Sequence, residues 1–94
     1  MPRYLVERTF PGGLAIPANA AGARVWQRVV QENASCGVTW LYSYLSDDLE
    51  TMVCVYDSPS PAAIRQAAAR NHLPVDRMTL VTIVDPNAYR GATK

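Results

Sequence analysis

Two apolar runs separated by a short polar stretch restrict the possible fold of this chain more than any other feature. The first run is WLYSYL at residues 40–45, the second is TMVCVYD at residues 51–57, and SDDLE lies between them. Aromatic and β-branched runs bounded by polar turn residues are typical of strands, and so short a connection joins antiparallel neighbours. Residues 40–57 therefore predict a β-hairpin, and both of its faces are apolar.

The alternation of side chains assigns the hairpin residues to two faces. A turn centred on Asp48 pairs Trp40 with Tyr56 and Tyr42 with Cys54. Successive side chains of a strand point to opposite faces, so one face collects the aromatic residues and the other the aliphatic ones. A slip of one residue would exchange the two faces. The predicted aromatic face consists of Trp40, Tyr42, Tyr44, Met52, Cys54 and Tyr56, and the aliphatic face of Leu41, Leu45, Val53 and Val55.

The rest of the chain predicts two helices and two further strands. Asn19 precedes a stretch with apolar residues at helical spacing, and its side chain can accept a backbone N–H of the first turn. Ser60 and Pro61 favour a second helix start, because proline at the first helical position has no N–H to leave unpaired. The expected elements are strands over residues 3–10 and 78–85 and helices over about 20–34 and over 62–71, beside the hairpin.

These elements follow the order strand, helix, strand, strand, helix, strand, which is the ferredoxin-like βαββαβ sandwich, an α+β fold. Right-handed crossovers place both helices on one face of a four-stranded antiparallel sheet. All 94 residues fit one domain, with an ordered core over about residues 3–86 and a polar C-terminal tail over 87–94. The other face of the sheet is then left bare.

The bare face is predicted to carry the aromatic side of the hairpin. So large an apolar patch is unusual on a soluble monomer, and a second copy of the same sheet is the simplest cover. We therefore expect a homodimer through the open face, an assembly of the dimeric α/β barrel type.

The first strand lies beside the third in this fold, so its side chains also reach the open face. Alternation leaves two candidate sets for that face. They are Leu5, Glu7, Thr9 and Tyr4, Val6, Arg8. We expect the set with Glu7, because the space between two sheets suits a carboxylate beside phenols better than contact with helices does.

Composition argues against several classes of partner. The net charge is +1 with 18% charged residues, so no broad field attracts nucleic acid. No segment approaches the roughly 18 apolar residues of a membrane span, and residues 1–13 lack the apolar run of a signal peptide. We expect a cytoplasmic protein without nucleic-acid or membrane partners, in which Cys36 and Cys54 are free thiols.

One chemistry open to the predicted face is transition-metal binding. Thiolate, carboxylate and imidazole groups are the usual ligands, and Cys54, Glu7 and the single histidine, His72, supply one of each. Both Cys54 and His72 also have plainer explanations. A cysteine is often a small buried hydrophobe, and a histidine at a helix C-terminus favours the positive charge wanted there.

The alternative is a site for a small molecule, either a binding site or an acid–base enzyme. Glu7 and Tyr42 would exchange protons with the ligand. The pocket would be lined by Trp40, Tyr44 and Tyr56. Tyrosines in such a cluster also serve simply as interface packing, so no residue is assigned a catalytic role.

Four stretches of the sequence resemble one known family. They are YLVERTF at residues 4–10, GVTWLYSYLSDD at 37–48, CVYDSPSPAAIRQAAARN at 54–71 and LPVDR at 73–77. In these stretches the chain is similar to small bacterial ferredoxin-like proteins described as nickel-binding, otherwise a family of unknown function. The resemblance implies a ferredoxin-like dimer and, for some members, bound nickel.

The resemblance also marks one departure. Many members have histidine where this chain has Tyr42, giving W-x-H-S-Y in place of WLYSY. The change removes an imidazole from the position predicted to face Cys54. Nickel remains the expected cofactor, and the expected metal-site positions are Glu7, Tyr42, Cys54 and His72.

Overall fold

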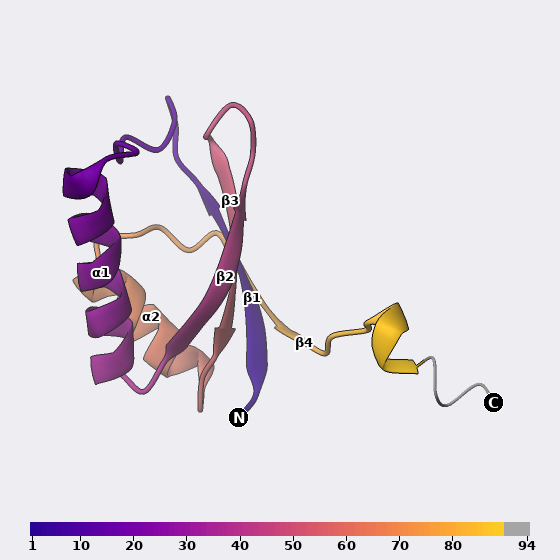
Figure 1. Cartoon of the computed structure of the whole chain (residues 1–94). Helices are drawn as coiled ribbons and strands as arrows, with labels where there is room; N and C mark the ends of the chain where they lie inside the picture. The colour runs from indigo at the N-terminus through magenta and orange to yellow at the C-terminus, as the bar shows by residue number, and fades with distance from the viewer. Residues whose placement is uncertain (90–94) are drawn as a thin grey trace.

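The computed structural model of the chain describes residues 1–89 and shows one sheet with two helices against one of its faces (Figure 1). In chain order the elements are β1 (Arg3–Thr9), α1 (Ala20–Ser35), β2 (Thr39–Leu45), β3 (Thr51–Asp57), α2 (Pro61–Arg70), β4 (Arg77–Val81) and the 3-10 helix η1 (Pro86–Tyr89). The four strands form an antiparallel sheet in the order β2-β3-β1-β4. The ferredoxin-like α+β fold is therefore confirmed.

Both helices begin at the capping residues that the sequence predicts. The side-chain oxygen of Asn19 accepts the backbone N–H of Gly22 at 3.1 Å. The hydroxyl of Ser60 accepts the N–H of Ala63 at 3.1 Å, with Pro61 opening α2. Each cap satisfies a donor that the first turn leaves without a partner inside the helix.

A glycine lets the chain before α1 pass close to its first turn. A Cβ built on Gly22 would lie 1.6 Å from the carbonyl oxygen of Pro17. No side chain fits that gap, so the approach of the connecting loop to α1 depends on glycine at this position.

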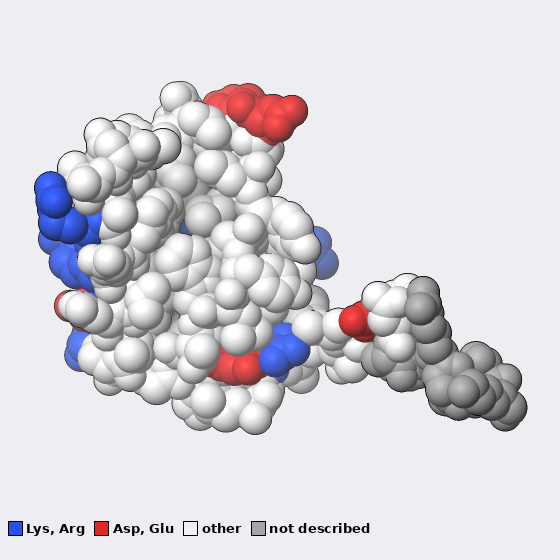
Figure 2. All heavy atoms as spheres, viewed as in Figure 1, with Lys and Arg blue, Asp and Glu red and all other residues white. Residues whose placement is uncertain are grey.

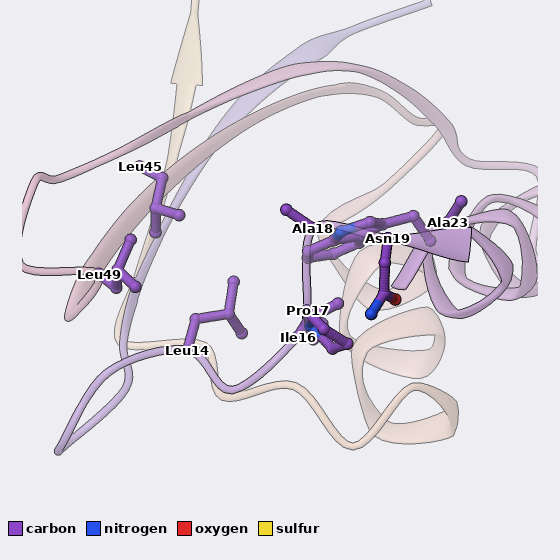
Figure 3. Close-up of a pocket in the computed structure, with 9 residues that line it drawn as sticks. Leu14, Ile16, Pro17, Ala18, Asn19, Ala23, Leu45 and Leu49 are labelled. Carbon is purple, nitrogen blue, oxygen red and sulfur yellow. The ribbon is translucent and has the colours of Figure 1, made fainter. Parts of the chain in front are cut away.

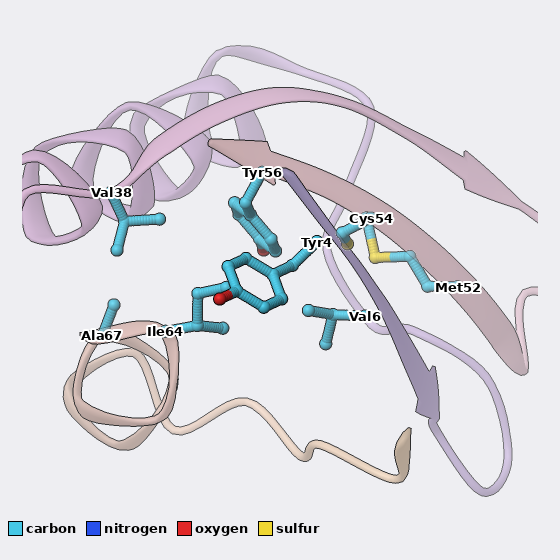
Figure 4. Packing of buried hydrophobic residues seen from close by; sticks show 8 residues of the cluster. All are labelled: Tyr4, Val6, Val38, Met52, Cys54, Tyr56, Ile64 and Ala67. Atoms are coloured by element: carbon cyan, nitrogen blue, oxygen red, sulfur yellow. The ribbon is translucent and has the colours of Figure 1, made fainter. Parts of the chain in front are cut away.

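The core fills the space between the sheet and the helices (Figure 4). Tyr4 and Val6 of β1 and Tyr56 of β3 face Ile64 and Ala67 of α2, and all five are buried. Burial of each large apolar side chain contributes roughly 1.5–3 kcal/mol relative to exposure in water. The opposite face of the sheet has no helix on it.

A β-bulge changes the pairing of the hairpin. Trp40 pairs with Tyr56 as predicted, but Tyr42 then pairs with Val55 and not with Cys54. The irregularity lies between Trp40 and Tyr42 and leaves Leu41 as the extra residue. Because one strand gains a residue that the other lacks, every later pair shifts by one position.

The shift divides the predicted aromatic face in two. Tyr42 and Tyr44 lie on the uncovered side of the sheet, as predicted. The placement of Trp40 and of three residues of β3 there is wrong, because these side chains point toward the helices. The three residues of β3 are Met52, Cys54 and Tyr56, all buried in the core cluster. Val53 and Val55 alternate with them and therefore lie on the uncovered side, contrary to the prediction.

The last strand is shorter than the sequence suggests. β4 ends at Val81, whose partner in β1 is Arg3, and not at Asp85. β1 begins at Arg3, so the residues after Val81 have no facing strand residue with which to pair. Residues 82–89 leave the sheet, and the predicted polar tail begins in η1, while its residues 90–94 lie outside the described part of the chain.

The two cysteines and the lengths of the helices can be compared with the sequence predictions. Cys36 and Cys54 are both free thiols, as predicted. Within residues 1–89, no helix has the length and apolar character needed to cross a bilayer.

Candidate functional site

The face of the sheet opposite the helices, which we name the open face, draws residues from all four strands. Strand pairing and alternation define its members. They are Arg3, Leu5, Glu7 and Thr9 of β1, Thr39, Tyr42 and Tyr44 of β2, Thr51, Val53, Val55 and Asp57 of β3, and Arg77, Thr79 and Val81 of β4. Glu7 therefore lies where the sequence predicts it.

The middle of the open face is apolar. Tyr42 and Tyr44 are 44% and 68% exposed. Their rings meet edge to face, with centroids 5.8 Å apart and an interplanar angle of 81°. Leu5, Val53 and Val55 lie on the neighbouring central strands. Apolar surface gathered in this way on one face is typical of a binding or subunit interface.

Two ion pairs border this apolar centre. Arg3 donates from Nε and Nη2 to the two carboxylate oxygens of Asp57, at 2.7 and 3.0 Å. This hydrogen bonding raises the pKa of Arg3 and lowers the pKa of Asp57. Glu7 has a looser contact with Arg77, with 3.7 Å between Oε2 and Nε. The carboxylate of Glu7 is thus less firmly engaged than that of Asp57.

The covered face contains a buried cation that the sequence reasoning left without a role. Arg8 is 2% exposed, and its Nε and Nη1 atoms have no hydrogen-bond partner within the described residues. Its guanidinium carbon lies 5.6 Å from the centre of the Tyr56 ring. Burial raises the pKa of Tyr56, and the nearby Arg8 charge opposes that rise. Alternation with Tyr4 and Val6 was the signal that Arg8 points inward.

Charged side chains are distributed unevenly around the molecule. In Figure 2, basic atoms gather over the helix layer and acidic atoms at the tip of the hairpin. At that tip, a carboxylate oxygen of Asp48 accepts hydrogen bonds from the Ser46 hydroxyl at 2.6 Å and from the Glu50 N–H at 3.0 Å. The Ser46 bond is the main cause of the lowered pKa of Asp48. The carboxylate of Asp48 therefore stabilises the hairpin turn through these two hydrogen bonds.

A hollow of about 700 Å³ lies where the first turns of α1 meet the hairpin (Figure 3). Trp26 of α1 and Leu45 and Leu49 of the hairpin form part of its wall, and Leu14 and Ile16 come from the loop before α1. None of the described residues that line it is charged. The sequence reasoning missed this hollow, because its shape depends on how the loop before α1 crosses the sandwich.

The four predicted metal-site positions do not come together in one chain. Glu7 and Tyr42 are on the open face, whereas Cys54 is 2% exposed on the covered face. His72 is exposed just beyond α2, in a left-handed backbone conformation with φ 55°. The expectation that Cys54 and Glu7 share a face is wrong, because Cys54 pairs with Val6 of β1 whereas Glu7 pairs with Val53.

The predicted aromatic pocket is not formed either. Tyr44 is on the open face, but Tyr56 and Trp40 are on the covered one. Trp40 packs against Trp26 with ring centroids 5.4 Å apart and donates its indole N–H to the Ser43 hydroxyl at 2.8 Å. Trp40 therefore connects the sheet to α1.

Comparison with known proteins identifies the family to which the chain belongs. A family model described as nickel responsive protein SCO4226-like matches residues 4–81. The chain belongs to this SCO4226-like family. The crystal structure of SCO4226 from Streptomyces coelicolor A3(2) superposes with a TM-score of 0.70 at 13% sequence identity, over 88% of this chain and 99% of that one. That likeness supports the shared fold, and a search of curated proteins found no match.

The name of the SCO4226-like family makes nickel the metal to test against the geometry. Sites for such ions combine several imidazole, thiolate or carboxylate ligands around one point. Within residues 1–89, no three His, Cys, Asp or Glu side chains lie close enough together to hold an ion. A single chain, as far as it is described, therefore does not fit Ni²⁺.

Proposed function

We propose that the protein has a nickel-related role as a homodimer, and that it binds Ni²⁺ only where the open faces of two copies meet. Membership of the SCO4226-like family over residues 4–81 supports the nickel-related role. The observation that carries the proposed location is the carboxylate of Glu7, which stands on a central strand beside the apolar centre of the open face.

The character of the open face supports the homodimer. Tyr42 and Tyr44 stay largely exposed while the same kind of side chain is buried on the covered face. Stacking two copies about a two-fold axis would bury the same patch on both and close the assembly. The ion pair of Arg3 with Asp57 would then lie at the rim, where charged groups are usual.

Glu7 is the better candidate ligand among the carboxylates of the open face. Both oxygens of Asp57 are already engaged by Arg3. Glu7 has only the 3.7 Å contact with Arg77. A two-fold axis near β1 supplies a second Glu7, so that a dimer provides two carboxylate ligands where one chain provides one.

Isothermal titration with Ni²⁺ tests this proposal, combined with sedimentation velocity of the same samples. We expect a dimer that binds one Ni²⁺ per two chains, with the binding heat lost in Glu7→Gln. Cys54→Ala and His72→Ala are the matched controls and should leave the binding unchanged, because neither residue is on the open face. Binding of one ion per chain, or loss of binding in either control, would contradict the proposed location.

A second variant tests the same site by gain of binding. Tyr42→His introduces the imidazole that the resemblance described above implies for this position. Imidazole suits Ni²⁺ better than a phenol does. We expect the variant to bind Ni²⁺ more tightly than the natural chain at the same stoichiometry. An unchanged affinity would mean that position 42 is remote from the ion.

A further inference from the structure

The segment after β4, residues 82–89, which we name the C-terminal arm, stands clear of the rest of the molecule. Figure 1 shows the arm running away from the helix layer and ending in η1. Ile83 and Val84 in the arm are 43% and 77% exposed. Two neighbouring β-branched apolar residues are thus presented to solvent on a segment that projects from the sheet.

The arm has local structure of its own. The side chain of Asp85 accepts the backbone N–H of Asn87 at 2.9 Å, which fixes the entry into η1. The 3-10 helix that follows spans Pro86–Tyr89. The turn satisfies polar groups locally, so the arm is a formed element. Ile83 lines a hollow with Met1 and Pro2, and Val84 is the more exposed of the two apolar residues.

The sheet explains why the arm leaves its own subunit. Val81 is the last residue of β4 to pair, and its partner Arg3 is the first residue of β1. The chain beyond Val81 therefore has no strand beside it. It continues away from the helices, toward the side that a second copy would occupy if two open faces were stacked.

We propose that the arm is exchanged between subunits, so that Ile83 and Val84 of one copy lie between the two stacked sheets, against the apolar centre of the open face of the other. The inference rests on the proposed homodimer and extends it by naming the segment that each subunit contributes to its partner's surface. The receiving residues are Leu5, Tyr42, Tyr44 and Val53, because Val55 beside them is already buried within its own chain.

A second copy of the chain is the occupant that the structure favours. One chain presents both an uncovered apolar face and an apolar arm, so two copies supply each other's missing surface. The exchange happens twice about one two-fold axis, which closes the assembly and leaves no arm unpaired. Burying the four β-branched side chains also adds apolar contact area to the dimer.

Photo-cross-linking in the full-length chain tests the exchange directly. The photoreactive residue p-benzoylphenylalanine replaces Val84, and ¹⁵N-labelled and unlabelled chains are mixed before irradiation. We expect mass spectrometry to find mixed-isotope cross-links from position 84 to peptides of β2 and β3. Cross-links confined to one chain, or directed to α1 and α2, would overturn the inference. The same probe at Val30, exposed on α1, is the control and should give no cross-links to those peptides.

Substitution of the arm gives an independent measurement. The double variant Ile83→Asp/Val84→Asp should raise the dimer dissociation constant by on the order of 100-fold. Sedimentation velocity over a concentration series measures this constant. Val30→Asp is the matched control and should leave that constant unchanged. An unaltered dissociation constant in the double variant would overturn the exchange while leaving the homodimer intact. A natural chain that remains a monomer would overturn both proposals, so the two failures are distinguishable.

Discussion

On the covered face of the sheet Tyr56 is 3% exposed, and on the open face Tyr44 is 68% exposed, although the two tyrosines belong to neighbouring strands of one hairpin. The covered face obtains its stability from α2, whose Ile64 packs against Tyr56 within the core cluster. The open face has similar side chains and no such layer. Apolar character alone therefore does not define the core of this protein, because the position of the helices decides which face becomes the core.

The difference between the two faces begins at one residue. Leu41 is the extra residue of the bulge, and beyond it Tyr42 and Tyr44 point away from the helices. Without the bulge, these tyrosines would share a face with Tyr56 and Trp40. The bulge thus keeps Trp40 in the core while it places two aromatic rings on the open face.

The largest expected effect comes from removing a tyrosine from each face in turn. Tyr56→Ala should lower the free energy of unfolding by about 3–5 kcal/mol, because it leaves a large cavity against the helices. Tyr44→Ala should change the stability of the dilute subunit by no more than about 0.5 kcal/mol. Urea unfolding at low protein concentration, followed by far-ultraviolet circular dichroism, measures both.

The same pair of variants separates folding from assembly. Tyr44→Ala is expected to weaken self-association while leaving the unfolding of the dilute subunit unchanged. If both variants lowered the stability of the dilute subunit equally, the two faces would not differ as described. If Tyr44→Ala left self-association unchanged, the open face would not be the subunit interface.

The sequence could predict the order of elements because each is encoded locally. Asn19, Ser60 and Pro61 begin the helices where the structure has them, and the β-rich runs are strands. The outward position of Glu7 was also predictable, because it follows from alternation along a single strand.

The composition of the site was less predictable, because it depends on register between strands. A bulge at Leu41 leaves no clear mark in the letters WLYSYL, yet it moves Tyr42 away from Cys54. The separation of Cys54 from Glu7 follows from the register of β1 against β3, which pairs Cys54 with Val6. The length of β4 was likewise hidden, since TIVD after Val81 has strand-like residues and lacks only a neighbour to pair with. Pairwise geometry between distant segments was the missing information in both cases.

Substitutions of two arginines of β1, Arg8 on the covered face and Arg3 on the open face, should change the stability by an intermediate amount. Arg8 is a buried cation without a carboxylate partner among residues 1–89, and such a charge is costly to remove from water. Arg8→Met keeps an unbranched apolar side chain and removes the charge, so it should raise the free energy of unfolding by about 1–4 kcal/mol. Arg3→Met, on the open face, should lower stability slightly, because Asp57 loses its partner.

Urea unfolding at neutral pH measures both arginine variants, with Arg8→Lys as the control that keeps the charge. Arg8→Lys should not reproduce the gain expected for Arg8→Met. A loss of stability in Arg8→Met would show that the Arg8 guanidinium has a hydrogen-bond acceptor in solution, which offsets the cost of burying its charge.

The smallest expected effect is the pH dependence of the rim of the open face. Hydrogen bonds from Arg3 hold the pKa of Asp57 below its ordinary value of 3.8. A carboxyl whose pKa is lower in the folded state stabilises the fold above its unfolded pKa, and this contribution is lost as the pH falls through the lowered folded value. The raised pKa of Arg3 lies at the alkaline end and does not affect this acid window. The difference in unfolding free energy between the natural chain and Asp57→Asn should therefore be constant from pH 7 to about pH 5 and shrink below pH 3.8.

Asp48→Asn, at the hairpin tip, is the comparison. The bond from Ser46 lowers the pKa of Asp48, so the stabilisation by Asp48 should be lost in the same pH window without involving the open face. Urea titrations at a series of pH values decide the outcome: a difference for Asp57→Asn that grows as the pH falls would mean that the Arg3–Asp57 pair does not stabilise the folded subunit.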